Sequence, residues 1–235
     1  EDDQKKFIAN VSHDFRSPLT SIRGFVETLL NGALEQPEMA RKFLNIIMME
    51  TERLTRLIND ILSISKLESG KDEVTVDRIR LDKITDEICE MLSINASEKD
   101  VDLSFKQPPK PVYILGNSDR VEQMLINIIE NAIKYNKPGG SVRVQVFADE
   151  EMANITVADT GIGIPEEHLP RLFERFYRVD KGRSREMGGT GLGLAIVKHI
   201  VKSMNGDIEV NSKFGEGTEF LITLPLFREN DGKQI

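Results

Sequence analysis

A histidine with an acidic neighbour is the first candidate for chemistry in this sequence. His13 is followed by Asp14, and a carboxylate beside an imidazole can hold one ring nitrogen protonated while the other keeps its lone pair. Heptad positions over residues 4–33 place His13 opposite the apolar stripe, which predicts an exposed ring. Pro18 lies inside the same helix, where it removes a backbone hydrogen bond at a cost of about 3 kcal/mol and predicts a bend beside this ring. The alternative is an ordinary solvated surface histidine.

An asparagine-containing stretch is the second candidate. Asn127, Asn131 and Lys134 share one helical face at i, i+4 and i+7. Such a face can offer an amide oxygen to a metal ion and an ammonium group to phosphates. Tyr135 follows directly and could stack on a base. The alternative is a polar stripe opposite the apolar side of the same helix.

An aspartate and two glycines form the third candidate. Asp159 ends a strand-like run and precedes Gly161 and Gly163. The glycines let the backbone approach a ligand closely. The carboxylate of Asp159 can accept a hydrogen bond from an exocyclic amino group, which adenine has. The alternative is a glycine-rich turn with a capping aspartate.

A glycine-rich run over residues 188–194 is the fourth candidate. Its four glycines in six residues suit a loop whose N–H groups surround phosphates at the start of a helix. It matches neither a Walker A loop nor a G-x-G-x-x-G fingerprint. The preceding residues 178–187 are rich in basic side chains and predict a mobile basic lid or, alternatively, a solvated loop.

Two antiparallel helices are expected to position His13. A turn is predicted at Asn31–Gly32 and Pro37. The apolar heptad residues of the two helices include Ile8, Phe15, Ile22, Leu29, Ala40, Phe43, Ile47, Leu54, Leu57, Ile61 and Ile64. So short a hairpin is too small for a core of its own, and a second copy would complete a four-helix bundle.

The other candidates fall in a region that mixes strands and helices after a polar break near residues 69–72. Strands are predicted at 101–106, 112–115, 141–148, 154–158, 207–211 and 219–224, and helices at about 82–98, 118–135 and 191–204. Few signals for parallel crossovers are present, so we expect an α+β sandwich of one sheet under a layer of helices.

Composition excludes several classes of protein. The 31 basic and 39 acidic residues give a formal charge of −8, which argues against a general role in nucleic-acid binding. One cysteine and three scattered histidines leave no disulfide framework and no zinc cluster. No apolar run approaches a membrane span, and no signal peptide is present. The start at Glu1 within a polar helical pattern indicates a fragment of a longer protein.

In order and spacing, six stretches resemble the signature boxes of sensor histidine kinases. Residues 12–19 resemble the H box, 127–135 the N box, 159–163 the G1 box, 173–178 the F box, 189–193 the G2 box and 215–218 the last glycine motif. The resemblance implies a dimerisation and histidine phosphotransfer domain at 1–70 and a catalytic ATP-binding domain of the Bergerat fold at 73–235. ATP binding by the α+β sandwich is implied by this resemblance alone.

The resemblance also implies roles for individual residues, with ATP and Mg²⁺ as cofactors. Asn131 would coordinate Mg²⁺ with Asn127 nearby, Lys134 would meet the phosphates, and Tyr135 the base or ribose. Asp159 would select adenine. The remaining nucleotide-binding positions would be Gly161, Gly163, Gly189, Thr190, Gly191, Leu192 and Gly193.

The partners implied by the resemblance are a second copy of the chain and a response regulator. His13, oriented by Asp14, would attack the γ-phosphate in line and pass the group to an aspartate of the regulator's receiver domain. The chain would be the cytoplasmic portion of a membrane-anchored bacterial protein whose membrane segments lie outside this sequence.

Two positions depart from the family pattern, and two other functions remain as alternatives. Asp14 stands where glutamate is usual, and Ser17 stands where threonine or asparagine usually supports phosphatase activity. The alternatives are an ATPase of the chaperone or topoisomerase type and a nucleotide-binding dimeric scaffold without kinase activity. The first generally has a glutamate where this chain has Asn127 and lacks the helix that carries His13.

Overall fold

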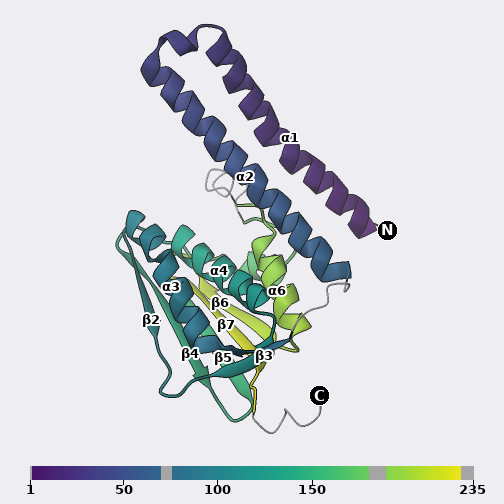
Figure 1. The fold of residues 1–235 in the computed structure, drawn as a ribbon, viewed down its shortest axis with the longest axis vertical. Helices are drawn as coiled ribbons and strands as arrows, with labels where there is room; N and C mark the ends of the chain where they lie inside the picture. Colours follow the sequence, from purple (N-terminus) through teal and green to yellow (C-terminus); the bar gives the residue numbers. More distant parts are fainter. Residues whose placement is uncertain (1, 70–75, 180–188, 229–235) are drawn as a thin grey trace.

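A long helical hairpin stands against a compact unit of strands and helices in the computed structural model, which describes residues 2–69, 76–179 and 189–228 (Figure 1). The hairpin consists of α1 (Asp2–Leu30) and α2 (Pro37–Ser69), with a 3₁₀ turn η1 (Ala33–Glu35) between them. Gly32 has φ +110°, a backbone conformation that favours glycine, so the predicted turn is confirmed. α1 continues through Pro18 to Leu30.

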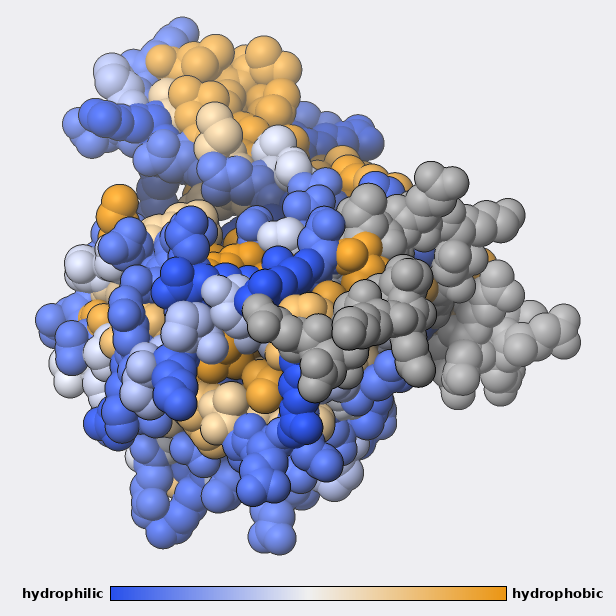
Figure 2. All heavy atoms as spheres, turned by 60° about the horizontal axis from the view of Figure 1, so that its bottom comes forward, coloured by the Kyte–Doolittle hydropathy of each residue, from blue (hydrophilic) through white to orange (hydrophobic). Residues whose placement is uncertain are grey.

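The heptad residues of α2 pack inward, as the sequence predicts. Leu57 and Ile64 are 3% and 5% exposed within one chain. A second apolar stripe on the same helix remains at the surface, and its members are Leu44, Met48, Ile58 and Leu62, between 46% and 61% exposed. α1 carries a matching exposed stripe of Leu19, Val26 and Leu30. In the described ranges neither stripe is covered, and Figure 2 shows orange side chains gathered on the hairpin at the top of the view.

The second unit is built on a mixed five-stranded sheet. Its order is β2-β4-β5-β7-β6, with β2 parallel to β4 and every other pair antiparallel. The strands are β2 (Val101–Lys106), β4 (Gly140–Ala148), β5 (Met152–Asp159), β6 (Asp207–Lys213) and β7 (Gly217–Pro225). This is the expected α+β sandwich, with each predicted strand of the sheet present within a few residues.

A two-stranded ribbon beside the main sheet was only half predicted. β3 (Tyr113–Gly116) was expected, but its antiparallel partner β1 (Asp77–Arg80) was not. β1 has three charged residues out of four, and only Ile79 is buried. A strand this short gives too little alternation of polar and apolar residues to be found in the sequence.

Three helices cover one face of the sheet (Figure 1). They are α3 (Leu81–Glu98), α4 (Ser118–Lys134) and α6 (Gly193–Ser203). α4 buries Val121, Met124, Leu125, Ile128 and Ile129 completely, and α6 does the same with Ile196 and Ile200. The 3₁₀ segment η2 (Glu166–Arg171) lies between β5 and α6 in the chain. The core is therefore the layer between the helices and the sheet.

The exposed stripe on α2 predicts where a second copy of the chain would pack. Ile58→Asp should convert a homodimer into a monomer, because an unpaired charge in an apolar interface costs several kcal/mol. Met91→Asp on α3 is the matched control, since Met91 is 52% exposed and lies outside the hairpin. Light scattering at micromolar concentration checks both variants. A wild-type monomer, or a dimer that survives Ile58→Asp, would contradict the prediction.

Candidate functional site

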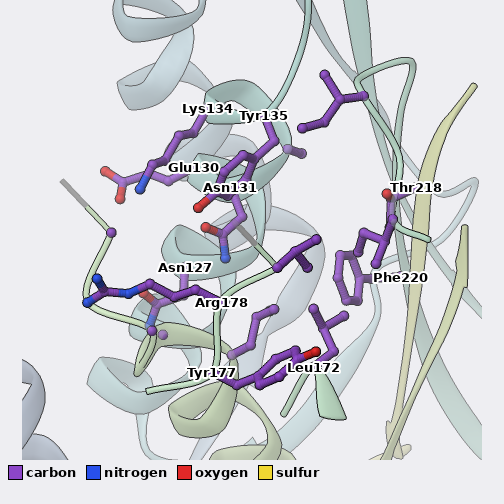
Figure 3. Close-up of a pocket in the computed structure, with 18 of the residues that line it drawn as sticks. Asn127, Glu130, Asn131, Lys134, Tyr135, Leu172, Tyr177, Arg178, Thr218 and Phe220 are labelled. Carbon is purple, nitrogen blue, oxygen red and sulfur yellow. The ribbon is translucent and has the colours of Figure 1, made fainter. Parts of the chain in front are cut away.

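A cavity of about 480 Å³ opens between α4, the loops that follow β5, and α2. It collects most of the positions predicted for a nucleotide, namely Asn127, Asn131, Lys134, Tyr135, Asp159, Gly163, Gly189, Thr190, Gly191 and Gly193. Of the other predicted positions, Gly161, Leu192, His13, Asp14 and Ser17 do not line it. Figure 3 shows Lys134, Glu130 and Arg178 on one side of the view and Thr218 and Phe220 on the other.

The rotation of α4 about its own axis determines which of its side chains reach the cavity. Asn117 caps the helix by accepting a hydrogen bond from the backbone N–H of Arg120 at 3.0 Å. Because one face of the helix is buried, Asn127 and Asn131 are turned to the cavity rim, where they are half-buried. Within the described residues their side-chain amides make no hydrogen bond to the protein. They are therefore available to a ligand.

The donor set around α4 fits a magnesium ion only together with phosphates. Among the described residues no group of three His, Cys, Asp or Glu side chains is arranged to hold a metal. Mg²⁺ is usually held by one or two protein oxygens plus substrate phosphates and water. The amide oxygen of Asn131 in a cavity with several cations fits this second mode.

Lys134 lies in a crowded positive region of the cavity. Its pKa is lowered to about 8, mainly because burial removes water from the ammonium group, and further because Arg56, Lys99 and Arg178 are nearby cations. Glu130 acts in the opposite direction. A lysine kept among cations in a partly dry cavity is suited to bind an anion.

Asp159 lies at the end of β5, on the wall of the cavity. Its Oδ1 accepts a hydrogen bond from the backbone N–H of Gly161 at 2.8 Å. Burial raises the pKa of this carboxyl, and hydrogen bonds from the backbones of Gly161 and Thr218 lower it by less. The other carboxylate oxygen of Asp159 takes no part in the bond with Gly161. Such a desolvated oxygen is suited to accept a hydrogen bond from an amino group of a ligand.

Two glycines in the loops of the site are required by their backbone. Gly163 has φ +64°, and a Cβ there would collide with the carbonyl of Lys213. Gly191 has φ +74°, and its carbonyl accepts a 2.8 Å hydrogen bond from Phe176. A side chain at either position would be strained. These glycines hold the loops against neighbouring backbone and so shape the cavity.

The glycine-rich run after residue 188 leads into α6 and is anchored by its leucine. The side chain of Leu192 is fully buried in the core, so only its backbone could face a ligand. The hydroxyl of Thr190 donates to Asp60 at 2.6 Å and accepts from the N–H of Leu192 at 3.3 Å. Of the predicted basic lid at 178–187, only Arg178 and Val179 lie within the described residues.

His13 is exposed, as predicted, and lies outside the cavity. Its side chain is 65% exposed, and its Nδ1 is 3.2 Å from Oδ1 of Asp14. Oδ2 of the same carboxylate accepts a hydrogen bond from Nη2 of Arg178 at 2.7 Å. Arg178 also donates to the carbonyl of Thr190 and lines the cavity. Asp14 therefore links the exposed histidine to the wall of the cavity. Ser17 lies one turn further along α1 and is half-buried.

Several lining residues were missed from the sequence. They are Arg56 and Asp60 on α2, Glu130 on α4, and the apolar or aromatic side chains of Leu172, Tyr177, Phe214 and Phe220. Arg56 and Asp60 stand at i and i+4, so their shared face was visible in the sequence. The sequence did not show that this face packs against the sheet unit, because a charged pair on a helix is usually solvated.

Two family models match the chain. "His Kinase A (phospho-acceptor) domain" matches residues 3–70, and "Histidine kinase-, DNA gyrase B-, and HSP90-like ATPase" matches residues 116–228. No helix in the described segments is both long enough and apolar enough to cross a membrane.

Curated relatives match over nearly the whole chain. The sensor histidine kinase WalK of Bacillus subtilis is 40% identical over 233 residues, which are 98% of this chain and 38% of that protein. The sensor protein kinase WalK of Staphylococcus aureus is 40% identical over 236 aligned residues, 99% of this chain and 56% of that protein. The chain therefore spans roughly two fifths to just over half the length of these two relatives.

Solved structures share the fold. A mycobacterial sensor histidine kinase, MprB, is 31% identical with a TM-score of 0.57, covering 64% of this chain and 98% of that one. ShkA in complex with AMPPNP is 29% identical with a TM-score of 0.69, covering 94% and 46%. The histidine kinase ThkA in complex with the response regulator TrrA has a TM-score of 0.76 at 24% identity, covering 94% and 61%.

The lowered pKa of Lys134 predicts that binding of a polyphosphate takes up a proton. A phosphate beside the ammonium group raises its pKa above the value of about 8 in the free protein. Protons are therefore captured from about pH 8 upward, and the affinity for the polyphosphate, tested with ATP, falls as the pH rises through that range. Calorimetric titration near pH 8.5 in two buffers of different ionisation enthalpy measures the uptake.

Lys134→Arg is the control for this uptake, because an arginine stays charged throughout the range. It should bind ATP with a heat that does not depend on the buffer. Wild-type heats that were equally independent of the buffer would contradict the assignment.

Proposed function

Because the chain belongs to the sensor histidine kinases, we propose that it binds Mg-ATP, phosphorylates its own His13 and passes the phosphoryl group to an aspartate of a response regulator. Residues 1–70 would be the dimerisation and phosphotransfer domain, and residues 73–235 the catalytic ATP-binding domain. The observation that carries this proposal is the polar link from His13 through Asp14 and Arg178 to a cavity lined by Asn127, Asn131 and Lys134.

The cavity offers different chemistry at its two ends. Asp159, with Phe220 and the loop around Gly163, would receive the adenine, because a desolvated carboxylate can accept from its amino group. Lys134 and Arg178 would receive the phosphates, with Asn131 as the protein ligand of Mg²⁺ and Asn127 nearby. When bound, Mg²⁺ neutralises charge on the phosphate oxygens. Tyr135 would lie against the base or ribose, beside Lys134, whose Nζ is 5.2 Å from the tyrosine ring centroid.

Asp14 would prepare His13 for attack. When Nδ1 carries the proton and shares it with Asp14, Nε2 keeps the lone pair that attacks the γ-phosphorus. The new N–P bond forms as the bond from the γ-phosphorus to the bridging oxygen breaks, and ADP leaves with that electron pair. His13 does not line the cavity, so transfer requires the hairpin and the nucleotide to approach each other.

The exposed surface around His13 would be the docking site of the regulator. Ser17 follows one turn after His13, so its hydroxyl could hold a water at the regulator's phosphoryl-aspartate and support phosphatase activity. Serine lacks the β-branch that restricts χ1 in threonine, so this activity would be modest. A homodimer held by the exposed stripes of α1 and α2 completes the proposed assembly, in a membrane-anchored parent protein.

Labelling with γ-³²P-ATP and Mg²⁺ tests the proposed reaction. The wild type should acquire a label that survives base and is lost in acid, as a phosphohistidine does. His13→Gln should lose the label and still bind ATP, because His13 is outside the cavity. Asn131→Ala should lose both. His199→Gln is the control, because His199 contacts the carbonyl of Leu67 and not the cavity, and it should keep the label.

The outcomes separate the proposal from its alternatives. Free phosphate without labelled protein would indicate an ATPase of the chaperone or topoisomerase type. Nucleotide binding with neither product would indicate a scaffold. A stable label on His13→Gln would place the acceptor at another histidine.

Asp159 predicts a preference for ATP over GTP. A carboxylate acceptor pairs with the amino group of adenine and faces an unfavourable carbonyl oxygen in guanine. Asp159→Asn, which presents a donor as well as an acceptor, should weaken ATP binding by about tenfold or more, since a hydrogen bond to a charged group contributes about 1.5–3 kcal/mol. Competition binding with both nucleotides measures this. Equal affinities of the wild type for ATP and GTP would refute the role.

A further inference from the structure

One face of α2 is seated on the sheet unit by polar contacts. Arg56, Asp60, Ser63 and Leu67 stand at i, i+4, i+7 and i+11, so they share one side of the helix. Asp60 accepts from Thr190 at 2.6 Å, Ser63 from Gln123 at 3.0 Å, and the carbonyl of Leu67 lies 3.2 Å from Nε2 of His199. Ile58, in the exposed stripe, is about 160° around the helix from Arg56. The seated face is therefore separate from the expected dimer face.

The N-terminal end of this seated face reaches the cavity. Arg56 and Asp60 both line it, although they belong to the helical hairpin. Asp60 is engaged by the hydroxyl of Thr190, in the glycine-rich run. Arg56, by contrast, has no hydrogen bond or ion pair to any other residue that the structure describes. A guanidinium group in this position has its five N–H donors available to a ligand.

Positive charge from three separate elements meets at this side of the cavity. Arg56 comes from α2, Lys134 from α4, and Arg178 from the segment before the glycine-rich run. Of these, Arg56 is the strongest cationic influence on Lys134. Asp60 and Glu130 lie in the same region, and burial raises the pKa of each carboxyl. Burial therefore disfavours the negatively charged forms that would balance the three cations. Such a cluster is suited to a multiply charged anion, and an arginine can bind phosphate with two parallel N–H bonds.

We propose that Arg56, on the second helix of the phosphotransfer hairpin, is a phosphate-binding residue of the nucleotide site, where its guanidinium binds the terminal phosphates of ATP. This inference rests on the proposed function. The nucleotide site is then formed by both units of the chain, because the hairpin supplies a phosphate-binding residue in addition to those of the sheet unit. ATP binding and the seating of α2 on that unit then reinforce each other.

The test compares ligands with and without phosphates on the full chain. Arg56→Gln should weaken binding of Mg-ATP by about 10- to 100-fold, the usual effect of losing hydrogen bonds to a charged group, and should leave the binding of adenosine unchanged. Arg56→Lys keeps the charge but not the planar guanidinium group, so its affinity for Mg-ATP should lie between those of the wild type and Arg56→Gln. Arg41→Gln is the matched control: Arg41 is exposed on the same helix, outside the cavity, and its ATP affinity should equal that of the wild type.

The outcomes distinguish this inference from the proposed function. A wild type that binds ATP and labels His13, together with Arg56→Gln of unchanged ATP affinity, overturns the role of Arg56 alone. Equal losses for ATP and adenosine in Arg56→Gln would also overturn it, because they indicate damage to the whole cavity. A wild type that binds no ATP contradicts the proposed function instead.

Discussion

The burial of one side of α4 against the five-stranded sheet is the constraint on which the site depends. Five apolar side chains of this helix are completely removed from water, and at about 25 cal/mol per Å² their burial outweighs the preference of any single polar residue. The helix therefore has one possible rotation about its axis. Asn127, Asn131 and Lys134 follow at helical spacing and are carried to the cavity rim. The position of Lys134 among cations is a consequence of core packing rather than of local attraction.

The crowding of positive charge has a physical cost that a ligand would relieve. Burial and three neighbouring cations lower the pKa of Lys134 to about 8. In the protein without a ligand, the ammonium group therefore loses its proton more easily than a lysine in water does. An anion placed there favours the charged form of Lys134 and lies near Arg56 and Arg178, which line the same cavity. The same arrangement explains why acidic side chains, Asp60 and Glu130, lie at the edge of the cavity. They reduce the repulsion without filling the place of the anion.

The hairpin and the sheet unit are held together by a chain of polar contacts. Asp14 touches His13 on one side and Arg178 on the other, and Arg178 donates to Thr190, whose hydroxyl donates to Asp60. α2 therefore meets the glycine-rich run directly through Asp60, and α1 reaches it through Arg178. The Asp14–Arg178 ion pair is largely shielded from water, since its side chains are 12% and 7% exposed. Apolar contacts lie beside the polar ones: Leu57 and Ile64 belong to the same buried cluster as the sheet residues, and the rings of Phe7 and Phe176 are 5.6 Å apart.

The sequence by itself determined the hairpin and the strands of the main sheet, because burial imposes periods of 3.6 and 2 on the order of polar and apolar residues. The heptads placed His13 on the exposed side of α1, and the spacing of Asn127, Asn131 and Lys134 placed them together. Only the tertiary structure decided that Asp14 meets Arg178, 164 residues away, that Leu192 is a core residue, and that Arg56 enters the cavity. A charged side chain on a helix has the same pattern whether water or another unit lies beside it. The pairing of distant surfaces therefore leaves no period in the sequence, and only packing can decide it.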